Sequence, residues 1–175
     1  MSGGTTRGVY PGSFDPPTIA HVAIAEAAAR AGNLERLDLA VSRVALGKDA
    51  TTQRPLGDRV ALITRLTRGR PWLHVVVTDA QLISDIAAGY DVVVMGADKW
   101  AQVNDPAWYD GSTAARDVAI AGLSRVLVAP RPGFDIVGAD ALGLPDHLAL
   151  VSSTAARAGR DDLIAPECRT EPRGA

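Results

Sequence analysis

Short runs of apolar, often β-branched residues alternate along the chain with longer segments of helical periodicity. Strands are predicted at 8–10, 37–42, 72–78, 90–96, 125–130 and 148–152. Helices are predicted at about 19–31, 56–68, 79–88, 113–121 and 153–159. Fully apolar strands such as VVVM, residues 92–95, are typical of a sheet that is covered on both faces. The pattern therefore predicts an α/β fold with a doubly wound, mostly parallel sheet and helices on both faces.

The segment 56–68 has the clearest amphipathic pattern. Its apolar stripe is formed by Leu56, Val60, Ile63 and Leu66, and Asp58, Arg59 and Arg65 are offset from that stripe. Two irregular segments, 43–55 and 130–146, are interpreted as surface loops. In a doubly wound sheet, ligands bind beyond the carboxyl ends of the strands. Functional residues are therefore expected where a strand leads into a helix.

Composition fits one domain of this class. The chain has 175 residues, of which 47% are apolar, and a formal net charge of −2, so it has no basic field for duplex nucleic acid. We expect a single domain over 1–165 and a flexible tail over 166–175. The single cysteine, Cys168, fits a reducing compartment, and no apolar run reaches the ~20 residues of a membrane span. These features indicate a cytoplasmic protein without nucleic-acid or membrane partners, and they leave open whether it forms a homo-oligomer.

The stretch GSFDPPTIAH, residues 12–21, joins the first strand to the first helix. Pro16 and Pro17 cannot be helical here, so Thr18 is the predicted N-cap and His21 lies in the first turn. A helix N-terminus favours anions, and we expect His21 to offer an outward-facing donor to a phosphate oxygen instead of completing a capping box. Gly12 allows close approach of a ligand, and Ser13 adds a hydroxyl.

Each of these residues also has an ordinary structural interpretation. A lone histidine is more often a helix-start residue without a function, and Asp15 is equally suited to an Asx turn ahead of the prolines. The second junction changes this balance. In VSSTAAR, residues 151–157, the hydroxyls of Ser152, Ser153 and Thr154 exceed what one cap needs. Arg157 follows one turn later with a side chain suited to phosphate. Two such junctions on one sheet edge predict a nucleoside triphosphate site.

The two stretches resemble the nucleotidylyltransferase superfamily that carries the (H/T)xGH and ISSTxxR motifs. The resemblance implies a Rossmann-like fold and transfer of an adenylyl or cytidylyl group to a phosphate acceptor, with release of pyrophosphate. It also implies that Thr18 and His21 contact the triphosphate. The other residues expected to bind ATP at the junctions are Gly12, Ser13, Phe14, Ser152, Ser153, Thr154 and Arg157. Ala20 replaces the glycine that precedes the motif's second histidine, and its methyl group is expected to crowd the adenine or ribose.

Such a transfer needs alignment of the acceptor phosphate and neutralisation of the departing pyrophosphate. The candidates are His21, Thr18, Arg157 and Lys48, together with Mg²⁺ held mainly by ATP phosphates and not by a protein cage. Lys48 lies in the polar loop after the second strand, where related enzymes carry a lysine. A solvated loop lysine is a nearly equal interpretation.

The stretch VVVMGADKW, residues 92–100, resembles nicotinate and nicotinamide mononucleotide adenylyltransferases. This resemblance implies that Gly96 and Asp98 bind adenylate ribose or backbone. It also implies that Trp108 and Tyr109 lie near a pyridine ring, where aromatic faces can stack. Asp15 and Lys48 complete the expected acceptor side of the site.

Alternatives remain for the acceptor. GSFDP, Thr18 and RPLGDRVALI, residues 54–63, fit phosphopantetheine adenylyltransferases at least as well, but the arginine-rich segment of those enzymes after the fourth strand is replaced by MGADK. Another small acceptor, or a nucleotide-binding relative without turnover, is also compatible with the motifs. We favour adenylyl transfer to a pyridine mononucleotide.

Overall fold

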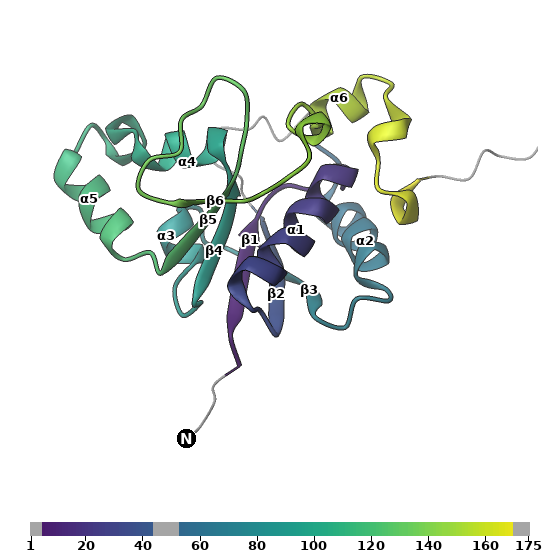
Figure 1. Ribbon diagram of the computed structural model, residues 1–175, viewed down its shortest axis with the longest axis horizontal. Helices are drawn as coiled ribbons and strands as arrows, with labels where there is room; N and C mark the ends of the chain where they lie inside the picture. Colours follow the sequence, from purple (N-terminus) through teal and green to yellow (C-terminus); the bar gives the residue numbers. More distant parts are fainter. Residues whose placement is uncertain (1–4, 44–52, 170–175) are drawn as a thin grey trace, which may run out of the picture.

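The computed structural model describes residues 5–43 and 53–169. In this part of the chain, six strands form one sheet in the order β3-β2-β1-β4-β5-β6, and every neighbouring pair is parallel. The strands are β1 (Arg7–Pro11), β2 (Arg36–Ser42), β3 (Leu73–Thr78), β4 (Val92–Gly96), β5 (Arg125–Ala129) and β6 (Asp140–Ala141). Their carboxyl ends point to the top of the view in Figure 1. The doubly wound, Rossmann-like fold predicted from the apolar strands is confirmed.

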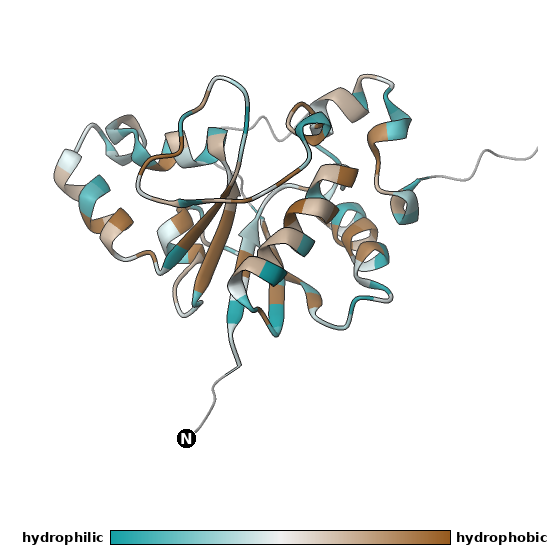
Figure 2. Cartoon of the chain, viewed as in Figure 1, coloured by the Kyte–Doolittle hydropathy of each residue, from teal (hydrophilic) through white to brown (hydrophobic). Residues whose placement is uncertain are grey.

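Helices cover both faces of this sheet. One hydrophobic cluster joins the strands to α1 (Ile19–Gly32) and α2 (Leu56–Thr67). A second cluster, on the other face, joins them to α3 (Ile83–Ile86), α4 (Ala97–Asn104) and α5 (Thr113–Ala121). Figure 2 shows hydrophobic residues along the central strands between these layers. The short helix α6 (Ser153–Arg157) lies beyond the strand ends, near the start of α1.

Two predicted elements differ from the structure. The strand predicted at 148–152 is wrong, because a 3₁₀ turn, η3 (Asp146–Leu148), occupies its start and the sixth strand is β6. Leu148 and Val151 bury their side chains against Ala20 of α1, which explains an apolar pattern without strand pairing. The helix predicted at 79–88 is reduced to α3, since residue 80 is held outside a helix by Ser42 and Thr78. Helix α4 was not predicted.

The expected flexible tail is partly a packed segment. The 3₁₀ turn η5 (Pro166–Cys168) follows η4 (Asp161–Leu163) and contacts α2. Cys168 is buried, and its thiol lies 3.2 Å from the carbonyl oxygen of Leu62. The rest of the expected tail lies outside the described residues. No helix in 5–43 or 53–169 is long and apolar enough to span a membrane.

Asp38 of β2 is buried at the centre of a polar network in the sheet. Its two carboxylate oxygens accept hydrogen bonds from Arg36 Nε at 2.7 Å and from the Tyr90 hydroxyl at 2.7 Å. Arg7 lies 3.5 Å from the same carboxylate and stacks over the Tyr90 ring. Burial raises the pKa of Tyr90 to about 12, with further contributions from the hydrogen bond to Asp38 and the negative charge of Asp38.

Candidate active site

The start of α1 is built as predicted, and His21 completes it. Thr18 is the N-cap, is fully buried, and its hydroxyl accepts a hydrogen bond from the His21 main-chain N–H. In return, the Thr18 main-chain N–H donates to Nδ1 of His21 at 2.9 Å. This is a capping box in which histidine takes the place of Glu or Gln. The expectation that His21 would not act as a cap was therefore wrong. Because Nδ1 accepts this hydrogen bond, it carries no hydrogen itself. In the neutral ring the hydrogen is therefore on Nε2.

The ring of His21 packs against aromatic side chains. Phe14 packs edge-on against it, with 5.0 Å between ring centroids, and Phe14 also packs edge-on against Tyr10 at 5.2 Å. A Cβ atom at Gly12 would lie 2.8 Å from Cζ of Phe14, so glycine is needed for this packing. Phe14 and Thr18 are buried and do not line the cavity described below. They position His21 and are not placed as the direct ATP contacts that we expected.

Hydrogen bonds link the second strand-to-helix junction, residues 151–157, to the first, residues 12–21. Ser152 caps α6 by accepting a hydrogen bond from the main-chain N–H of residue 155. Ser153 Oγ donates to the Pro16 carbonyl at 2.8 Å. The Arg157 guanidinium donates to the Asp15 carbonyl and lies 3.4 Å from Thr154 Oγ1. Part of the hydroxyl-rich sequence therefore holds the two junctions together.

Both junctions open into one cavity of about 370 Å³, called here the nucleotide cavity. Its lining residues are Tyr10, Pro11, Gly12, Ser13, His21, Gln53, Met95, Gly96, Asp98, Lys99, Arg131, Ser152, Ser153, Thr154 and Arg157. His21 and Arg157 thus line the same cavity, as expected for two helix starts at one edge of the sheet. A Cβ atom at Gly96 would lie 2.5 Å from Oδ1 of Asp98, so the absence of a side chain there leaves room for this carboxylate.

Two cations of this cavity were not singled out in the sequence. Arg131 lies two residues beyond the end of β5, and its Nη1 donates to the carbonyls of Ala149 and Val151 at 3.1 and 2.9 Å. It thereby fixes the segment that leads into α6. Lys99 lies in the first turn of α4, with Nζ 2.6 Å from Oε1 of Gln102, and burial lowers its pKa. The signal that could have found both is a basic residue just beyond a strand's carboxyl end.

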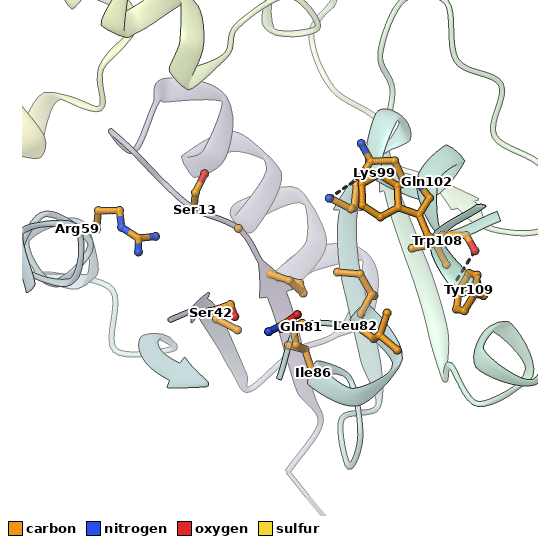
Figure 3. Close-up of a pocket in the computed structure, with 15 residues that line it drawn as sticks. Ser13, Ser42, Arg59, Gln81, Leu82, Ile86, Lys99, Gln102, Trp108 and Tyr109 are labelled. Atoms are coloured by element: carbon orange, nitrogen blue, oxygen red, sulfur yellow. Dashed lines mark hydrogen bonds between the residues drawn. The ribbon is translucent and has the colours of Figure 1, made fainter. Parts of the chain in front are cut away.

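A second cavity, of about 110 Å³, adjoins the first and is called here the acceptor cavity (Figure 3). The two share Pro11–Ser13 and Lys99. The other lining residues are Ala40, Ser42, Arg59, Gln81, Leu82, Ile83, Ile86, Gln102, Val103, Trp108 and Tyr109. The Tyr109 hydroxyl donates to the Val103 carbonyl at 3.1 Å, which fixes its ring in the wall. The structure therefore brings Trp108 and Tyr109 to a cavity beside the nucleotide cavity.

Two other residues that the sequence singled out lie elsewhere. Asp15 is fully buried and lines neither of these cavities, because its carboxylate accepts hydrogen bonds from the Arg54 guanidinium at 2.7 Å and the Arg54 main-chain N–H at 3.0 Å. Ala20 does not line the nucleotide cavity either, since its methyl group packs against Leu148 and Val151. It is therefore not placed to crowd a nucleotide there. Lys48 lies outside the described residues.

Residues 9–159 match the family described as Cytidylyltransferase-like, a range that includes both junctions and α4. The chain belongs to the cytidylyltransferase-like family. This membership confirms the resemblance to nucleotidylyltransferases that the two motifs indicated, and it supports a nucleotidyltransferase. The comparison with curated proteins returns no match.

Solved structures of nucleotidyltransferases share the fold. Plasmodium falciparum nicotinic acid mononucleotide adenylyltransferase complexed with NaAD superposes with a TM-score of 0.66 over 94% of this chain and 93% of that chain, at 12% sequence identity. The structure of the same enzyme complexed with APC has a TM-score of 0.62 over 88% of this chain and 83% of that chain, again at 12% identity. At this identity the similarity establishes the fold.

Proposed function

We propose that the protein transfers AMP from ATP to the phosphate of nicotinate or nicotinamide mononucleotide and releases pyrophosphate, a step of NAD biosynthesis. In this reaction an oxygen of the acceptor phosphate forms a bond to the α-phosphorus, and the bond from that phosphorus to the β-phosphate oxygen breaks. The observation that carries the proposal is the shared wall of the two cavities at Pro11–Ser13 and Lys99. Such a wall allows two bound phosphates to meet.

The charges of the nucleotide cavity suit a triphosphate. The basic side chains in its described lining are His21, Lys99, Arg131 and Arg157. These groups would orient the phosphates and neutralise the charge that develops on the departing pyrophosphate. The acceptor phosphate is itself a competent nucleophile, so positioning is the main task of the protein.

Mg²⁺ fits this cavity as a companion of the triphosphate. Magnesium favours oxygen ligands and commonly binds through substrate phosphates with one or two carboxylates. Asp98 is the carboxylate among the described lining residues, and it is half-exposed beside Arg131 at 3.8 Å. When bound, the ion would supply further neutralisation of phosphate charge.

The acceptor cavity supports a pyridine mononucleotide because Trp108 and Tyr109 offer aromatic surfaces in its lining. The fold relative crystallised with NaAD supports the same product class. Phosphopantetheine is the second candidate, because the side chains of Leu82, Ile83 and Ile86 would also suit a flexible apolar arm.

The test is pyrophosphate release in the presence of Mg²⁺. ATP and CTP are each combined with nicotinate mononucleotide, nicotinamide mononucleotide or phosphopantetheine. We expect turnover with ATP and a pyridine mononucleotide, and loss of turnover in H21A. Turnover with phosphopantetheine alone would transfer the assignment to the second candidate. ATP binding without pyrophosphate from any acceptor would instead indicate a non-catalytic nucleotide-binding protein.

A further inference from the structure

Arg59 of α2 is a buried cation in the wall of the acceptor cavity. Its offset from the apolar stripe predicted no burial, yet only 4% of the residue is exposed. Nε donates to the Arg54 carbonyl at 3.2 Å, whereas Nη1 is buried and has no hydrogen-bond partner among the residues that the structure describes. A guanidinium is always charged, and leaving one of its donors unpaired in a buried site is costly. This arrangement is explained if a ligand supplies the missing acceptor.

The surroundings of Arg59 specify an anion. The described lining of the acceptor cavity contains the cations Arg59 and Lys99 and has no carboxylate. Arg59 also takes part in none of the ion pairs found in the described residues. A bound anion would therefore provide both the charge and the hydrogen-bond acceptor that the protein leaves out.

The position of Arg59 within the cavity indicates which part of the acceptor it would bind. Figure 3 shows its guanidinium pointing from α2 into the cavity, toward the side where Ser13 and Ser42 lie, with Trp108 and Tyr109 at the opposite end. Ser13 belongs to the wall shared with the nucleotide cavity. The proposed transfer requires the acceptor phosphate to lie near that wall. The pyridine ring of the acceptor would then extend toward Trp108.

We propose that Arg59 binds the phosphate monoester of the acceptor and is a specificity-determining residue of this site. The inference rests on the proposed function, because it uses the acceptor phosphate as the attacking group. It goes further by assigning the phosphate end of the acceptor to α2 and the ring end to η2 (Pro106–Tyr109). A guanidinium suits phosphate because it can donate two parallel hydrogen bonds.

The experiment compares R59K and R59Q with R65Q, a matched control, since Arg65 lies on the same helix and is exposed. Steady-state rates are measured over acceptor concentration with ATP fixed, and over ATP concentration with acceptor fixed. We expect the KM for the mononucleotide to rise about tenfold or more in R59Q and less in R59K. The KM for ATP is expected to stay within about twofold, and R65Q should match the wild type.

Three pyridine ligands separate the phosphate from other groups. Calorimetric affinities are measured for nicotinate mononucleotide, nicotinamide mononucleotide and nicotinate riboside. Loss of affinity for both mononucleotides, with the riboside unaffected, supports a phosphate subsite. A loss confined to the two nicotinate compounds would overturn it in favour of the carboxylate. R59K preserves the charge and keeps the comparison available if R59Q does not fold.

The outcomes also separate this inference from the proposed function. Turnover with unchanged acceptor KM in both variants would overturn the role of Arg59 and leave the function intact. If the wild type turns over neither mononucleotide, the same affinities are measured for phosphopantetheine and pantetheine. A selective loss for phosphopantetheine in R59Q then supports the phosphate subsite although the pyridine assignment fails. Equal affinity of wild type and variants for every phosphorylated ligand overturns it.

Discussion

The Thr18 main-chain N–H and Nδ1 of His21 lie 2.9 Å apart, so the first helix of the protein is capped by the same imidazole that lines the nucleotide cavity. One nitrogen is used for folding, and Nε2 is the nitrogen that we propose donates to a phosphate oxygen. The capping role of His21 and its proposed catalytic role can therefore be separated by choice of substitution.

H21A is expected to lose both contributions. Removing a capping interaction costs about 1 kcal/mol of unfolding free energy, and removing a donor to transition-state charge lowers kcat about 10²–10³-fold. H21Q is the matched variant, because its amide oxygen can accept the hydrogen bond from Thr18 as in an ordinary capping box. It should recover stability but not turnover. Urea unfolding and pyrophosphate release measure the two effects. Wild-type turnover in H21A would contradict the role of His21.

Ser153 links the two junctions through its hydrogen bond to the Pro16 carbonyl. S153A is expected to reduce stability by about 1 kcal/mol, the net value of a typical hydrogen bond, and to raise the KM for ATP because the cavity walls are less firmly held. S152G is a suitable comparison, since Ser152 caps α6 without bonding to the first junction. Thermal unfolding and ATP titration test both. An unchanged KM for ATP in S153A would show that the link serves the fold alone.

The parts of the site that the sequence predicted are those set by local signals. Pro16 and Pro17 exclude a helix and Thr18 caps one, so the start of α1 follows from a few neighbouring residues. The contacts of Arg131 to the carbonyls of residues 149 and 151 could not be predicted this way, because they join segments that are distant in sequence. Arg59 was missed for a related reason, since periodicity placed it off the apolar stripe, whereas in the folded structure it is buried.

The prediction of a strand at 148–152 was also wrong because of contacts between segments distant in sequence. A short apolar run is a signal of a buried strand, but it does not identify the surface against which its residues pack. Leu148 and Val151 contact Ala20 across the junction instead of pairing with β5. The prediction of a helix start at this junction does not depend on the error, because α6 still begins at residue 153 as predicted.

Lys99 provides a prediction on pH. Burial lowers its pKa, so it loses its charge at a lower pH than an ordinary lysine, while the charge of Asp98 acts weakly in the opposite direction. Phosphate binding favours the charged form, so the KM for ATP should rise as pH increases through this lowered pKa. K99R stays charged and should remove the rise, whereas K99M should have a high KM at every pH. Identical pH profiles for wild type and K99R would exclude this role.

Tyr90 gives a stability prediction that does not involve the active site. Its pKa is raised to about 12 by burial, by the hydrogen bond to Asp38 and by the charge of that carboxylate. The ordinary pKa of tyrosine in an unfolded chain is about 10. Because the folded state holds the proton more tightly, this contribution to stability is complete below about pH 10. It is lost as the pH rises toward about 12.

Y90F removes the titrating group and its hydrogen bond. The unfolding free energy of the wild type should therefore exceed that of Y90F near neutral pH by about 1 kcal/mol, and the difference should shrink between about pH 10 and 12. Comparing the two proteins cancels the titration of other groups, including buried Tyr10, whose pKa is also raised by burial. Urea unfolding across this range provides the measurement. A difference that stays constant with pH would mean that the Tyr90 hydroxyl is not held by Asp38 in the folded state.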